Sequence, residues 1–326
     1  MQTGIRFSLL VTAGLAVVGA LQAGTVTFSV TNDAPANGMW IMRPWVGVSD
    51  GNFTTFTVGS AASAAIQHEA EDGVTGDPAN QLPPSNACSA AAPGQTGSDC
   101  LYQSFNGYAN GTSQVSIGNP TRPGATISGT LNTTPGDANS QYLSYLIMAI
   151  PSNDTFFGSP TSAPVQLYDA GGNFLGTGAN NDITITVYSN MTIVTDALGT
   201  FTYTAAQGGG LMDAGTEQNL GCPNGAGSSD GVAFLCQGSA GQGTHTGVSG
   251  MVEPDVTPFG SSIVNGSNGF GGTTNTFTAI NDAFTNPGNP IATIEITASP
   301  EPASVVLFGS ALGLLGLAAR RRGRAA

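Results

Sequence analysis

Apolar and polar residues alternate with a period of two in short runs along most of the chain, and Gly, Asn, Asp and Pro separate these runs. Such alternation is typical of half-buried β-strands joined by turns. We expect strands at 26–31, 53–58, 125–131, 142–150, 164–168, 183–188, 201–204 and 292–297. The sequence therefore predicts an all-β fold, an antiparallel β-sandwich with long Gly/Ser-rich loops.

Three segments depart from this pattern. Residues 61–71 are rich in Ala and end in acidic residues, which predicts a short helix that Gly73 terminates. Residues 77–99 are rich in Pro, Ala and Ser, and residues 222–275 are dominated by Gly, Ser and Thr. We expect these last two segments to form surface loops that decorate a single domain at 24–298.

The N-terminus combines one positive charge, Arg6, with an apolar run at 7–21 and small residues at Ala20 and Ala23. This is the layout of a secretory signal peptide, here residues 1–23. A buried core helix is the alternative, but strand-like alternation begins immediately afterwards.

The C-terminus, residues 299–326, begins with Pro300, Glu301 and Pro302, continues in an apolar stretch at 303–319 and ends in Arg320, Arg321, Arg322 and Arg324. At about 1.5 Å per residue the stretch reaches about 25 Å, enough for a single membrane-spanning helix whose arginines stay in the cytoplasm. The order of these parts resembles the PEP-CTERM sorting tail. That resemblance implies processing by an exosortase in a Gram-negative-type bacterium that makes exopolysaccharide. A permanent tail anchor is the alternative.

The charge of the chain excludes some partners. There is no Lys, and only Arg43 and Arg122 lie outside the two end segments, whereas the chain has twenty acidic residues. Such a body repels nucleic acids and anionic lipid and suits divalent cations. We therefore expect no nucleic-acid partner, and membrane contact only through the C-terminal helix.

The four cysteines are Cys88, Cys100, Cys222 and Cys236. Each near pair encloses a loop rich in small residues, and an exported protein lies in an oxidising compartment, so Cys88–Cys100 and Cys222–Cys236 are the natural disulfides. Three pairings remain possible from the sequence. A zinc site is disfavoured because there is no Cys-x-x-Cys motif.

Three motifs carry a family resemblance. A strand-like run leads through Gly59, Ala62 and Ser63 to Glu69-Ala-Glu-Asp-Gly73; an apolar run leads through Pro151-Ser-Asn-Asp154 to Gly158; and the third motif is Asp213-Ala-Gly-Thr-Glu217. In this order they resemble the spondin domain, the module at the N-terminal side of F-spondin. The stretch between Gly158 and Asp213 is longer than in compact members, and the cysteines do not match those of animal members.

The resemblance implies a β-sandwich with one bound Ca²⁺ and a role in matrix or adhesive contact. The implied ligands are Asp154, Asp213 and Glu217. Calcium takes six to eight oxygen ligands, and Gly215 lets the backbone between the last two acids turn tightly. The alternative is that Asp154 and Asp213 are ordinary turn residues.

An enzyme of the same matrix is the second class of function. Acidic pairs such as Glu69 with Glu71, or Glu253 with Asp255, could serve glycoside cleavage if their separation were suitable. A solvated acidic face explains them more simply. His68 and His245 lie in no nucleophile motif. Trp40, Trp45, Phe53 and Phe56 could stack on sugar rings, but aromatic residues at strand spacing are more often core residues. Activity on purified exopolysaccharide, with and without Glu253→Gln and Glu69→Gln, would separate this secreted polysaccharide-active enzyme from a binding protein.

Overall fold

The computed structural model describes most of the body of the chain. The described residues are 24–73, 75–78, 100–118, 120–150, 152, 154–177, 181–216, 250–255, 263–267, 274–277, 279 and 282–299. The expected signal peptide, the sorting tail and its helix at 303–319 lie outside them. None of the helices in this described part is long and apolar enough to cross a membrane.

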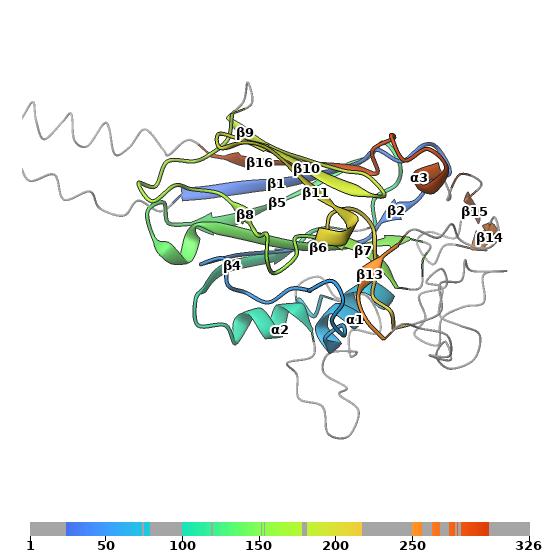
Figure 1. Ribbon diagram of the computed structural model, residues 1–326, viewed down its shortest axis with the longest axis horizontal. Coiled ribbons are helices and arrows are strands. Elements are labelled where there is room, and N and C mark those ends of the chain that lie inside the picture. Colours follow the sequence, from blue (N-terminus) through green and yellow to red (C-terminus); the bar gives the residue numbers. More distant parts are fainter. Residues whose placement is uncertain are drawn as a thin grey trace, which may run out of the picture.

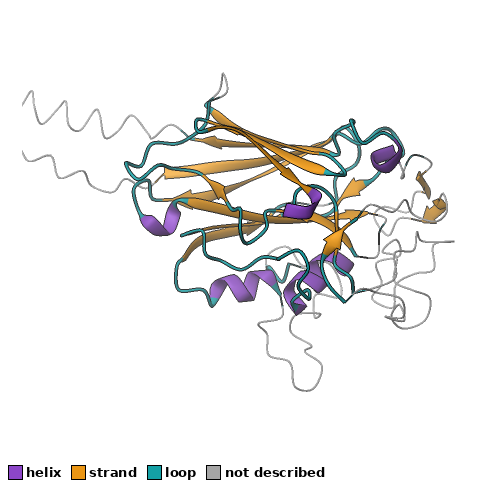
Figure 2. Cartoon of the chain, in the orientation of Figure 1, coloured by secondary structure: helices purple, strands orange, loops and turns teal. Residues whose placement is uncertain are grey.

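Within the described residues, the strands form two large antiparallel sheets and a small ribbon (Figures 1 and 2). The first sheet has the order β11-β10-β9-β16-β1-β5. Its strands are β1 (Gly24–Asn32), β5 (Thr126–Thr133), β9 (Asp182–Val187), β10 (Met191–Asp196), β11 (Gly199–Thr204) and β16 (Ala292–Ala298).

The second sheet has the order β13-β12-β7-β6-β3-β4, with β2 and β8 also paired to β6. Its strands are β2 (Trp40–Ile41), β3 (Trp45–Ser49), β4 (Gly111–Ser116), β6 (Tyr142–Ile150), β7 (Thr155–Gly158), β8 (Val165–Gln166), β12 (Met212–Asp213) and β13 (Glu253–Pro254). The ribbon pairs β14 (Ile263–Ser267) with β15 (Thr274–Phe277).

The helices are short. They are α1 (Ala64–Asp72), α2 (Leu101–Asn106), α3 (Asp282–Thr285), and the 3-10 turns η1 (Ala138–Ser140) and η2 (Ala205–Gln207). In Figure 2, α1 and α2 lie below the second sheet, on the face turned away from the first sheet. The molecule is therefore a β-sandwich with a third, helical layer on one face.

Two apolar cores result from this layering. The larger core lies between the sheets and includes Phe28, Val46, Tyr145 and Ile294. The smaller core lies between the second sheet and the helices, and its largest buried side chains are Trp45, Phe53, Phe56, Leu101, Phe105 and Phe156. Strand β6 serves both cores because successive side chains point to opposite faces, which explains why almost all of its residues are buried.

Helix α1 ends at Gly73 as expected, but it begins at Ala64, three residues after the expected start. The Ser63 hydroxyl accepts a hydrogen bond from the Ile66 N–H over 3.3 Å, as an N-cap does. Gly73 ends the helix in the left-handed region, at φ 60°, and a Cβ atom there would collide with Met42. Only glycine fits both the conformation and the space.

Several expected strands match the structure, but the one at 53–58 is wrong. Its Phe53, Thr55 and Phe56 are buried, yet the segment has no ladder partner among the described residues. The Thr55 N–H donates to Thr161 Oγ1, the Thr55 hydroxyl donates to the Ser159 carbonyl, and the Thr161 N–H donates to the Phe56 carbonyl. These bonds to a facing loop take the place of a β-ladder.

The expected surface loops also need correction where they are described. Asp77 is 6 % exposed, and its carboxylate accepts a hydrogen bond from the N–H of Ser116 at the end of β4. In the second segment, strand β13 joins the sheet, and Val252 and Asp255 are buried. Both segments therefore contain residues that pack against the second sheet, although their composition predicts surface loops.

Candidate metal centre

The second sheet brings two of the expected calcium ligands to one edge. Asp154 lies just before β7, and Asp213 ends β12. Because β12 pairs with β7, Asp213 lies opposite Thr155, the residue that follows Asp154. On its other side, Asp213 lies opposite Glu253 of β13. Three acidic residues from distant parts of the sequence therefore meet at the β7–β12–β13 edge.

The backbone after Asp213 folds around Asp154. The Ala214 N–H donates to the Asp154 carbonyl over 3.0 Å, and the Thr216 N–H donates to Asp154 Oδ2 over 3.2 Å. The Gly215 N–H donates to Asp213 Oδ1 over 2.6 Å, with Gly215 at φ 68°. This glycine conformation makes the tight turn that holds both carboxylates at one point.

The surroundings of this edge disfavour a negative charge on Asp154 and Asp213 at the same time. Asp154 is completely buried. Burial raises the pKa of the Asp213 carboxyl, hydrogen bonds from the Gly215 N–H and with the Asp154 side chain lower it in part, and the charge of Glu253 raises it. A hydrogen bond between two carboxyl groups requires a proton on one of them. The pair thus holds either a proton or another positive charge.

Asp255 belongs to the same edge, which the sequence did not indicate. It is 2 % exposed, its N–H donates to the Leu211 carbonyl, and its Oδ2 accepts from the Thr155 hydroxyl over 2.8 Å. Glu253 beside it is exposed. The interpretation of Glu253 and Asp255 as one solvated acidic face is therefore wrong for Asp255. The apolar Met251 and Val252 within a Gly/Ser-rich stretch were a weak sequence signal of a strand there.

The residues present fit part of a calcium site. Carboxylates from two segments are hard oxygen ligands of the kind that Ca²⁺ prefers. Glu217, the third expected ligand, lies outside the described residues. Within the residues that the structure describes, no group of three or more His, Cys, Asp and Glu side chains is arranged to hold a metal ion.

A second acidic residue of the motifs, Glu69 of α1, is also completely buried. Neither of its carboxylate oxygens has a hydrogen-bond partner among the described residues. Burial raises its pKa well above the usual value, and the nearby Arg43 guanidinium lowers it in part. Arg43 itself is 7 % exposed. The expectation that Glu69 lies on a solvated face is wrong, because α1 packs this side chain against the second sheet.

This burial also bears on the enzyme alternative. A polysaccharide does not reach a carboxylate with no exposed surface, so Glu69 is not placed to act on one in this structure. The four aromatic residues weighed as sugar-stacking platforms, Trp40, Trp45, Phe53 and Phe56, are each 6 % exposed or less. They are core residues, as their spacing indicated.

The cysteines are only partly described. Cys100 is completely buried at the start of α2, and no cysteine of the described residues is a free thiol. Cys88, Cys222 and Cys236 lie outside the described residues, as do Pro300, Glu301, Pro302 and the arginines of the tail. The pairings Cys88–Cys100 and Cys222–Cys236 therefore stay predictions.

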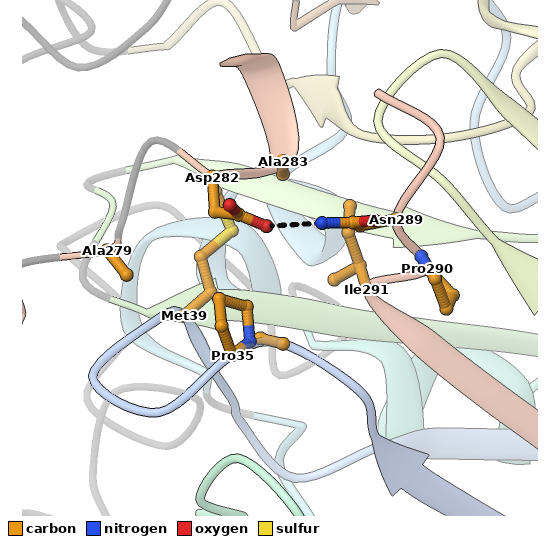
Figure 3. Close-up of a pocket in the computed structure, with 9 residues that line it drawn as sticks. Pro35, Met39, Ala279, Asp282, Ala283, Asn289, Pro290 and Ile291 are labelled. Atoms are coloured by element: carbon orange, nitrogen blue, oxygen red, sulfur yellow. Dashed lines mark hydrogen bonds between the residues drawn. The ribbon is translucent and has the colours of Figure 1, made fainter. Parts of the chain in front are cut away.

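Two pockets lined by described residues are too small for a substrate. The one in Figure 3 lies between the 34–39 loop, α3 and the start of β16, and its volume is about 10 Å³. Asn289 Nδ2 donates to Asp282 Oδ2 there over 3.1 Å, and Asn286 Nδ2 donates to Oδ1 over 2.6 Å. A second hollow between the sheets, beside Tyr145 and Tyr203, has a similar volume. Each holds about one water molecule.

Comparison with known proteins adds no relative. The chain matches no protein-family model, and a search of curated proteins found no match either. The likeness to the spondin domain therefore rests on the three motifs alone.

Proposed function

We propose that this chain is an exported, non-enzymatic, calcium-binding protein of the cell surface or extracellular matrix, with a spondin-like body. The observation that supports it best is the meeting of Asp154 and Asp213 at the β7–β12 edge. Two motifs that the resemblance links to one calcium ion contribute side chains that touch, although 59 residues of sequence separate them.

The charges of the body favour a cation at this edge. Glu253 faces Asp213 across the β12–β13 ladder, and Asp255 lies two residues further along, just after β13. With no Lys in the chain, few cations are available to neutralise these acids. A divalent ion would offset the burial and the negative charge of Glu253, which both raise the pKa of Asp213.

Calcium should stabilise the protein by linkage. At about a hundredfold excess over the dissociation constant, the free energy of unfolding should rise by about 2.7 kcal/mol. We would measure the melting temperature of the full-length chain, in mild detergent, with Ca²⁺ and with a chelator. The shift should be larger at pH 8 than at pH 5, because calcium binds the deprotonated form of Asp213.

A matched pair of variants tests the site. Asp213→Asn removes one proposed ligand and should abolish most of the shift. Asp33→Asn removes the same charge from the first sheet, where Asp33 accepts a hydrogen bond from Thr293, and should keep it. If the chelator leaves the melting temperature of the parent unchanged, Asp154 and Asp213 are turn residues and the calcium proposal fails.

Export and sorting form the other half of the proposal. The end segments suggest that the mature protein begins between residues 21 and 25 and loses the segment after Pro302. An exosortase would perform the second cleavage, and exopolysaccharide or another matrix component would be the partner. The intact mass of protein from its native host decides the matter. A mass that still includes Arg320 to Ala326 would point to a permanent tail anchor instead.

A further inference from the structure

The two edge strands of the first sheet, β5 and β11, have different surroundings. At the β5 edge, the Asn132 N–H donates to the Ser113 hydroxyl of β4, and a Cβ atom at Gly129 would lie 2.7 Å from Ile117. The second sheet therefore closes on this edge. At the other edge lies β11, whose residues are exposed except for the half-buried Tyr203.

In an antiparallel sheet, the backbone N–H and C=O groups of successive residues point alternately to the two sides of a strand. This alternation shows which backbone groups of β11 point away from the sheet. The Tyr188 N–H donates to the Met191 carbonyl, so Met191 faces β9, and the residues of β10 then alternate between β9 and β11. Thr192, Val194 and Asp196 face β11, where their partners are Tyr203, Phe201 and Gly199. The N–H and C=O groups of Thr200, Thr202 and Thr204 consequently point away from the sheet.

Thr204 is already satisfied within the chain. Its N–H donates to Gln207 Oε1, and its carbonyl accepts from the Gly209 N–H. No hydrogen bond joins the outward backbone groups of Thr200 and Thr202 to other described residues. Proteins commonly protect such an edge with Lys, Pro or a bulge, but β11 has none of these.

The side chains of this edge are apolar or neutral. Phe201 is 38 % exposed although its cross-strand neighbour, Val194, belongs to the core, and Leu198 at the hairpin turn is 57 % exposed. No charged residue occurs between Asp196 and Asp213. In a strongly acidic protein, this neutral stretch is a place where a second copy can approach without charge repulsion.

We propose that β11 pairs with β11 of a second copy, antiparallel about a two-fold axis at Phe201. Thr200 of one copy then lies opposite Thr202 of the other, and the outward groups of both threonines make four main-chain hydrogen bonds. Phe201 lies opposite its own copy as a non-hydrogen-bonded pair, in which side chains are closest. The first sheets of the two copies merge, and both exposed phenylalanines lose solvent contact.

Disulfide trapping tests this register. In Phe201→Cys, the two Cα atoms would lie about 4.5 Å apart, which is within the range of a disulfide. Leu198→Cys is the matched control: it is more exposed, but about six residues, or about 20 Å, would separate it from its copy. On oxidation of the full-length chain, Phe201→Cys should form linked dimers about tenfold faster or more.

Sedimentation of the purified chain gives an independent measurement. The parent should be a dimer, and Thr202→Pro should be a monomer, because proline removes an outward N–H and is tolerated on an edge strand. An unchanged melting temperature would show that Thr202→Pro still folds. Equal trapping rates for the two cysteine variants, or a monomeric parent, would overturn the proposal.

Discussion

Asp154 and Glu69 are both completely buried carboxylic acids, but their surroundings differ. Asp154 accepts a hydrogen bond from the Thr216 N–H and contacts Asp213 at a sheet edge. The Glu69 carboxylate projects from α1 without a hydrogen bond to the described residues, and only the attraction of Arg43 favours its charge. Burial alone therefore does not decide what a carboxylate does; the donors and charges around it do.

Asp50 extends the comparison to a third environment. Burial would raise its pKa, but hydrogen bonds from Tyr108, Asn52 and Asn110 outweigh that effect and lower the pKa to about 2. The Tyr108 hydroxyl alone donates over 2.6 Å. A carboxylate that accepts several hydrogen bonds stays deprotonated down to a low pH. A buried carboxylate that accepts none, such as Glu69, binds a proton at a higher pH.

The largest effect should come from removing the cation beside Glu69. In Arg43→Met, a buried carboxylate at pH 8 loses the attraction that offsets its burial, so the free energy of unfolding should fall by about 3 kcal/mol. The loss should be smaller at pH 4, where Glu69 binds a proton. Chemical denaturation at both pH values measures the difference.

A double variant separates charge from packing in that experiment. Arg43→Met with Glu69→Leu replaces both charged partners by apolar groups and should recover much of the stability. Arg43 is also attracted to Asp77, so full recovery is not expected. If Arg43→Met alone leaves stability at pH 8 unchanged, Arg43 does not hold the charge of Glu69.

A smaller effect should appear in the pH dependence of Glu69→Gln. The pKa of Glu69 is higher in the folded state than its usual value of 4.5, so the folded protein binds more protons between these two values. The contribution to stability is therefore complete below about pH 4.5 and is lost as the pH rises toward the folded-state pKa. Glu69→Gln should remove this loss and flatten the profile.

The control for that profile is Glu295→Gln, which changes an exposed glutamate of β16. It should leave the pH dependence as it is in the parent. Thermal unfolding between about pH 4 and pH 8 would compare the three proteins. A profile that Glu69→Gln does not alter would mean that Glu69 has the same pKa in the folded and unfolded chain.

Much of the fold could be predicted where one face of a strand is buried and the other is not. Strands β1, β9 and β16 alternate between buried and partly exposed residues, and their expected positions agree with the structure to within two residues at each end. Strands β3 and β7 are buried on both faces, so they have no alternation to find. Helix α2 was missed because its buried residues are only Leu101 and Phe105, one turn apart.

The candidate site, too, could be predicted only in part from the sequence. The sequence identified Asp154 and Asp213 through motifs, but could not show that Asp255 lies on the same edge, because β13 is two residues long and lies in a Gly/Ser-rich stretch. It also placed Glu69 on a solvated face, since the acidic end of a helix is usually exposed. Helix α1 packs on the second sheet instead, and residues 69 and 70 are both buried.

By itself, the sequence determined the strand period, the stop of α1 at Gly73 and the acidic character of the body, because these depend on neighbouring residues or on composition. Only the tertiary structure decided which acids share a surface, which carboxylate lacks a donor and which sheet edge stays open. Those properties depend on strand order and register, which bring Asp154 to Asp213 and leave β11 at the end of the sheet. A strand's own residues do not specify its neighbours, so these contacts could not be read from the pattern alone.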